Sequence, residues 1–169
     1  MFNIFKRKKK TAIWETDFDD IWNIDNRNDM IIALGSWLSR KCNYGEDIDK
    51  LSPTEQIVFF IFQLEAEVNN GGFTQYFGNF TGIYANETLT ALRKIGAIET
   101  ANICKNVFSY FGETIPTDRD EYDEFIGKTL TDEVEALLHQ YDMEFFKFPD
   151  NLTELTYKFA IDNKAQFSR

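Results

Sequence analysis

The sequence contains very little histidine and cysteine, and this shortage excludes several kinds of site. His139 is the only histidine, and Cys42 and Cys104 are the only cysteines. A zinc site of the usual cysteine and histidine type needs more ligands than one chain supplies. Two cysteines without a secretory hydrophobic segment are typical of a reducing compartment, so we expect buried thiols and a cytoplasmic protein. We predict no metal and no cofactor.

Long hydrophobic runs are also absent, and glycine and proline are scarce. No run approaches the roughly 18 apolar residues of a transmembrane helix. Only 9 Gly and 3 Pro interrupt the chain, whereas hydrophobic residues make up 43% of it and aromatic residues 16%. A chain with this composition can bury one large core. We expect one folded domain over residues 13–169, preceded by a basic, disordered tail over residues 1–12.

Positive charge is scarce after the first ten residues. The head, MFNIFKRKKK, carries five cations, and the whole chain has a net charge of −10, so residues 11–169 carry −15. Such an acidic body repels nucleic acids and anionic membranes and attracts basic proteins. We therefore predict a basic protein partner, no direct nucleic-acid binding and no stable membrane insertion. A further interpretation is that the basic head docks the domain to a membrane or to nucleic acid.

Helix signals, in contrast, are abundant. In the stretch LSPTEQ, Ser52 is placed as an N-cap, Pro53 as the first helical residue, and Glu55 completes a capping box. The following run is apolar on every side, which predicts a buried central helix over about 53–69. Similar patterns elsewhere predict an all-α fold of seven or eight helices. Between Gly112 and the predicted helix TDEVEALLHQYD, the pattern indicates only a linker and an acidic segment.

The stretch EVNNGGFTQYF, residues 67–77, is open to two interpretations. It does not follow a strand and no Lys-Ser/Thr pair follows its glycines, which excludes a P-loop. One interpretation is a corner, in which Asn70 or Gly71 adopts positive φ to end the helix while a nearby glutamate accepts hydrogen bonds from a neighbouring helix's amides. The other is a hydrolase or small-ligand pocket. The pocket hypothesis involves Glu65, Glu67, Asn69, Asn70, Tyr76 and Tyr84.

Carboxylates are concentrated in two other segments. Residues 113–135 hold nine acids against two cations, and residues 15–29 hold six acids against one. Carboxylates fixed on helices at spacings near those of phosphates can occupy the cationic groove of a DNA-binding protein. We therefore expect partner binding on these segments. The predicted partner-binding residues are Asp17, Asp19, Asp20, Asp118, Asp120, Glu121, Asp123, Glu124, Asp132 and Glu133.

From LSPTEQ to the Ile-Gly-Ala at 95–97, the sequence resembles a bacterial family once described only as a domain of unknown function and now named after a DNA-mimic protein. The likeness extends over roughly residues 15–168. Its signature is Glu-x-x-Asn-Gly-Gly-Phe followed by an aromatic pair. The residues that carry this signature here are Glu67, Asn70, Gly71, Gly72, Phe73, Tyr76 and Phe77.

The resemblance implies an all-helical acidic protein. For the characterised member it implies a dimer whose negative surface imitates duplex DNA and sequesters a helix-turn-helix transcription regulator. The leading hypothesis is therefore a non-enzymatic protein that sequesters a basic DNA-binding protein. By the same resemblance, a homodimer is a possible state of the protein. The alternative hypotheses are an immunity-type inhibitor of a basic nuclease toxin, and the pocket near Glu65–Asn70.

Overall fold

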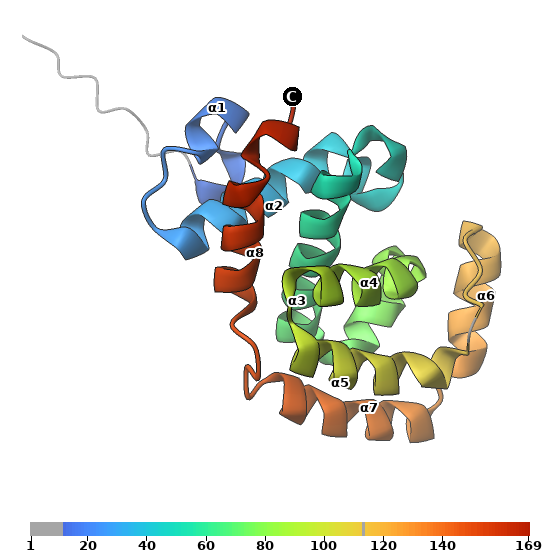
Figure 1. The fold of residues 1–169 in the computed structure, drawn as a ribbon. Helices are drawn as coiled ribbons and strands as arrows, with labels where there is room; N and C mark the ends of the chain where they lie inside the picture. The colour runs from blue at the N-terminus through green and yellow to red at the C-terminus, as the bar shows by residue number, and fades with distance from the viewer. Residues whose placement is uncertain (1–11, 113) are drawn as a thin grey trace, which may run out of the picture.

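Eight α-helices joined by short 3₁₀ turns make up the part of the chain that this computed structural model describes, residues 12–112 and 114–169 (Figure 1). Those residues form no strand, so the all-α prediction is confirmed. Apart from Ala12, the predicted basic tail lies outside the described residues. The helices are α1 (Phe18–Ile21), α2 (Arg27–Lys41), α3 (Pro53–Gly78), α4 (Ala85–Ile95), α5 (Ile98–Phe108), α6 (Arg119–Thr129), α7 (Asp132–Phe145) and α8 (Leu152–Asp162).

Helix α3 is the central helix that the sequence predicts. The Ser52 hydroxyl accepts a hydrogen bond from the Glu55 amide, and the Glu55 carboxylate accepts one from the Ser52 amide, which completes the capping box. The helix contacts α2, α4, α7 and α8. Its side chains from Val58 to Leu64 lie almost entirely in the core, because apolar residues occur on every side of this part of the helix. None of the described helices is both long and apolar enough to cross a membrane.

The glycine pair bends α3 and does not end it. Gly71 has an ordinary negative φ of −153°, whereas Gly72 has φ 73°, so the expectation of positive φ at Asn70 or Gly71 is wrong by one or two residues. A second helical segment starts at Phe73, whose backbone amide donates to the Asp142 carboxylate of α7 at 2.8 Å. A buried carboxylate thus caps the restarted helix, where exposed amides and the helix dipole favour negative charge.

A second buried carboxylate joins the α2–α3 region to the C-terminal segment. Glu55 is fully buried, and its oxygens accept from the Lys41 ammonium at 2.8 and 2.9 Å and from the Ser168 amide at 3.1 Å. The end of α2, the start of α3 and the segment after α8 are therefore held at one point. Helix α8, which precedes this junction, packs against α2 (Figure 1).

Helix α6 is an element that the sequence analysis did not identify. Its apolar contacts are few: Tyr122 and Ile126 are buried and Phe125 is partly buried. The Tyr122 hydroxyl donates to the Phe77 carbonyl at 2.7 Å, which fixes α6 against the end of α3. In Figure 1, α6 lies at one edge of the molecule, on the side opposite α1 and α8. The acidic segment is therefore an ordered, peripheral helix.

Candidate functional site

The polar side chains around the glycine pair hold the bend of α3 together. The Glu67 carboxylate accepts from the side-chain amides of Gln75 at 2.6 Å and Asn79 at 2.7 Å. The Asn70 amide donates to the Gln75 carbonyl oxygen at 3.0 Å. The expectation that a glutamate here accepts from amides of a neighbouring helix is therefore wrong, because Asp142 of α7 provides the contact between helices.

The aromatic residues of the signature are core residues. Phe73, Tyr76 and Phe77 are almost completely buried. The Tyr76 hydroxyl lies 3.0 Å from the Thr88 hydroxyl, and burial raises the pKa of Tyr76. The Phe77 ring stacks on the Phe111 ring with 3.5 Å between centroids. These side chains build the fold and do not line a surface site.

Only two of the residues of the pocket hypothesis meet in one hollow. Glu65 and Asn69 line a groove of about 340 Å³ with Asn28 and Thr153, as their spacing of one helical turn allows. Burial raises the pKa of the Glu65 carboxyl group. Tyr84 instead donates its hydroxyl to a backbone carbonyl 2.7 Å away in the α2–α3 connection. The other predicted members serve the bend or the core, so the predicted constellation is not assembled.

The acids at the start of α6 divide into one cap and four exposed side chains. The Asp118 carboxylate accepts hydrogen bonds from the second and third backbone amides of the helix, at 3.0 and 3.1 Å. Glu124 forms an ion pair with Lys128, and this hydrogen bond and charge lower the Glu124 pKa. Asp118 therefore has a structural role as the N-cap. The four exposed carboxylates that follow it are Asp120, Glu121, Asp123 and Glu124.

The first turn of α7 contributes two more exposed carboxylates. Leu130 and Thr131 alone separate α6 from α7, and Asp132 and Glu133 are exposed. A hydrogen bond to the Thr131 side chain is the main cause that lowers the pKa of Glu133. We group the exposed acids of these two consecutive helices under the name α6–α7 acidic face. Its residues are Asp120, Glu121, Asp123, Glu124, Asp132 and Glu133.

The predicted acids of α1 lie elsewhere. Asp17, Asp19 and Asp20 are exposed, but Figure 1 places α1 on the opposite side of the molecule from α6. Asp19 also accepts from the Arg169 guanidinium at 3.2 Å. The structure therefore separates the predicted partner-binding residues into two surfaces.

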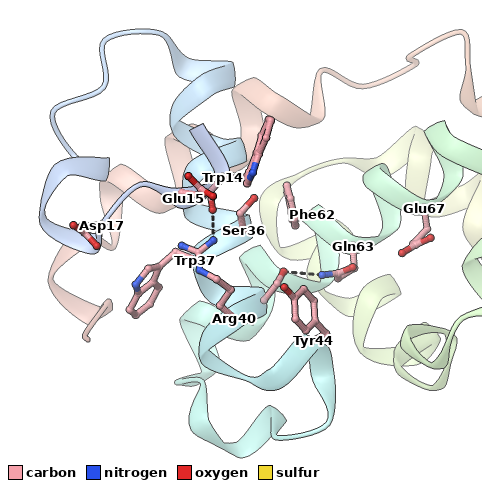
Figure 2. Close-up of a pocket in the computed structure, with 11 residues that line it drawn as sticks. Trp14, Glu15, Asp17, Ser36, Trp37, Arg40, Tyr44, Phe62, Gln63 and Glu67 are labelled. Atoms are coloured by element: carbon pink, nitrogen blue, oxygen red, sulfur yellow. Dashed lines mark hydrogen bonds between the residues drawn. The ribbon is translucent and has the colours of Figure 1, made fainter. Parts of the chain in front are cut away.

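A second hollow contains aromatic residues that the sequence analysis did not single out. It has a volume of about 730 Å³ and lies among η1 (Ile13–Glu15), α2, η2 (Asn43–Gly45) and α3 (Figure 2). Trp14 and Tyr44 belong to its lining, and both are largely exposed. No periodic pattern marks either residue, because each lies in a short turn outside the α-helices.

Comparison with known proteins gives one match. A model of the DMP19-like protein family matches residues 49–163. No curated protein and no solved structure matches the chain. The matched range contains α3 to α8, and hence the α6–α7 acidic face, but it does not include α1 or α2.

Proposed function

Because the chain belongs to the DMP19-like family, which is a family of DNA mimics, we propose that it is a non-enzymatic protein that binds a basic DNA-binding protein and keeps it from DNA. The binding surface in this proposal is the α6–α7 acidic face. The partner is a transcription regulator or another protein whose groove is lined with lysine and arginine for phosphate binding.

The observation that supports this proposal most directly is the charge density of α6. Four exposed carboxylates occupy the five positions from Asp120 to Glu124. A helix rises about 1.5 Å per residue, so these four charges are spread over about 6 Å along the helix axis. Duplex DNA carries one charge per about 1.7 Å of its axis. The number of negative charges per ångström of axis is therefore similar on α6 and on duplex DNA.

The helix that carries these carboxylates is held in place. Asp118 caps it, and the buried Tyr122 hydroxyl ties it to the Phe77 carbonyl. A helix that is already formed needs no further ordering of its backbone when it binds, which favours competition with DNA. A basic nuclease toxin would present the same kind of cationic groove, so the same face supports the alternative of an immunity-type inhibitor.

The proposal is tested by neutralising the face without changing its shape. In the fourfold variant Asp120→Asn, Glu121→Gln, Asp123→Asn and Glu124→Gln, the affinity for the captured partner is expected to fall about fourfold or more, since exposed ion pairs contribute about 0.2–1 kcal/mol each. The assay is capture from a lysate of the source organism, followed by measurement of the dissociation constant and its salt dependence with the recovered partner.

The matched control removes four exposed charges elsewhere by the substitutions Asp49→Asn, Glu87→Gln, Glu99→Gln and Asp162→Asn. This variant has the same net charge as the test variant, so it should retain the partner. Duplex DNA should also displace the partner from the unchanged protein. The proposal would be wrong if the recovered partner is not a basic nucleic-acid-binding protein, or if both variants lose it equally.

A further inference from the structure

The hollow of Figure 2 has aromatic side chains on its rim and a mostly uncharged floor. Trp14 is 58% exposed and Tyr44 is 65% exposed, and in Figure 2 they lie on opposite sides of the hollow with Phe62 and Gln63 between them. The Gln63 amide donates to the Ser39 hydroxyl at 2.8 Å, so this side chain is held in place. Two large exposed rings beside one cavity offer flat faces to a ligand. We call this hollow the Trp14–Tyr44 pocket.

The charge around the pocket is negative. Among the lining residues that the structure describes, Glu15, Asp17 and Glu67 contribute three carboxylates and Arg40 is the one cation. The Arg40 guanidinium donates to the backbone carbonyls of Trp14 and Thr16, so it fixes the turn that carries Trp14. Within residues 12–112 and 114–169, neither Glu15 nor Asp17 forms an ion pair. The pocket therefore attracts a cationic ligand.

The backbone at Tyr44 is unusual and does not serve the core. Asn43 has φ 50° and Tyr44 has φ 56°, a left-handed conformation that is costly for a bulky residue. Hydrogen bonds hold the turn in place: the Gly45 carbonyl accepts from Tyr84 at 2.7 Å, and the Gly45 amide donates to the Cys42 carbonyl at 3.1 Å. The strained backbone places an aromatic ring in solvent at the pocket rim, where it contributes little to folding.

We propose that the Trp14–Tyr44 pocket binds one arginine side chain of the basic partner. A planar guanidinium stacks on aromatic faces and donates several hydrogen bonds to carboxylates, whereas a lysine ammonium is a compact and more strongly hydrated charge. Trp14 and Tyr44 provide the faces, and Glu15, which lies beside Trp14 in Figure 2, provides an acceptor, whereas Asp17 lies farther away and adds negative charge. This inference rests on the proposed function, because it assumes a basic protein partner, but it uses residues outside the α6–α7 acidic face.

The test uses three blocked tripeptides and the full-length protein. Acetyl-Gly-Arg-Gly-amide is expected to bind saturably in an NMR titration and to shift the indole N–H signal of Trp14. The lysine peptide is expected to bind at least about threefold more weakly, and the uncharged citrulline peptide at least about tenfold more weakly. Equal binding of the arginine and citrulline peptides would overturn the proposal.

Variants then locate the binding site. Trp14→Ala and Tyr44→Ala are each expected to weaken the arginine peptide roughly 2- to 30-fold, which is the range of cation–π interactions. Phe148→Ala is the matched control, because Phe148 is 62% exposed and also has a left-handed φ of 49° but lies outside this pocket. Equal loss in the control and the test variants would contradict the assignment.

Two further results separate this inference from its rivals. Binding that appears only in the variant Arg7→Gln would mean that the chain's own head occupies the pocket, and this would overturn the assignment to a partner. The α6 fourfold variant should bind the arginine peptide normally. Loss of peptide binding with intact partner capture refutes only the pocket, whereas intact peptide binding without capture refutes only the proposed function.

Discussion

Gly72 determines how the central helix continues after its bend. Its φ of 73° is a left-handed conformation, and a Cβ atom there would lie 2.4 Å from one Asp142 carboxylate oxygen. The other oxygen of the same carboxylate accepts from the Phe73 amide. Only a glycine therefore satisfies both the backbone and the approach of Asp142.

The substitution Gly72→Ala is expected to lower the free energy of unfolding by about 2–4 kcal/mol, because it adds backbone strain and displaces a buried acceptor. Chemical denaturation measures the change. Gly127→Ala is the matched control: nothing lies within 4 Å of a Cβ at Gly127, within α6, so stability there should stay the same or rise by about 0.5–1 kcal/mol. Similar losses at both glycines would contradict this account of the bend.

Glu65 is a half-buried carboxylate that destabilises the fold when it is charged. Burial raises the pKa of Glu65 in the folded state above its ordinary value of 4.5. At pH values between the unfolded-state pKa and the folded-state pKa, the folded state therefore binds more protons than the unfolded state. The free energy of unfolding therefore falls as pH rises through this interval. Glu65→Gln is expected to increase stability at pH 7, and the gain should disappear below about pH 4.5.

Thermal or chemical denaturation over a pH series measures this effect. Glu67→Gln is the control from the same helix, because the Glu67 carboxylate accepts two amide hydrogen bonds and its neutralisation should not stabilise the protein. A gain for Glu65→Gln that persists at pH 4 would show that the cause is not the charge of this carboxylate.

The helices differ in how far their own sequence specifies them. The start of α3 could be predicted because its capping box and its apolar run are local signals within a few residues. The acidic α6 has no comparable apolar stripe. It depends on Tyr122 reaching a carbonyl at the end of α3, and on Gly82, where a Cβ would lie only 2.2 Å from the Tyr122 hydroxyl. Such contacts between distant segments cannot be inferred from periodicity.

The two candidate sites also differ in whether local sequence or contacts between distant segments specify them. The exposed acids of the α6–α7 acidic face could be identified from composition alone, because charged residues without partners stay at the surface. The Trp14–Tyr44 pocket could not, since η1, α2, η2 and α3 must first pack together. The unusual backbone of Asn43 and Tyr44 also has no signal in a single sequence.

Across the whole molecule, the two acidic surfaces differ in their placement. The α6–α7 acidic face lies within the range matched by the family model, residues 49–163, whereas α1 lies outside it. Each surface has one paired carboxylate: Asp19 pairs with Arg169 on α1, and Glu124 pairs with Lys128 on α6. Helix α1 lies on the opposite side of the molecule from α6 (Figure 1), so a groove seated on α6 is attracted mainly by the carboxylates nearest to it. The α6–α7 acidic face should therefore dominate the electrostatic attraction.

A pair of charge-matched double variants tests this difference. Asp120→Asn with Asp123→Asn should weaken binding of the captured partner several-fold and flatten its salt dependence, because each removed contact lowers the electrostatic share of the affinity. Asp19→Asn with Asp20→Asn makes the same change in net charge on α1 and leaves Asp17 at the Trp14–Tyr44 pocket, so it should change the affinity by less than about twofold. The dissociation constants of both variants would be measured at about 50, 100 and 200 mM salt, so that the ionic strength doubles at each step. Equal effects of the two variants would mean that only the total charge of the molecule matters and that the placement of carboxylates on α6 does not.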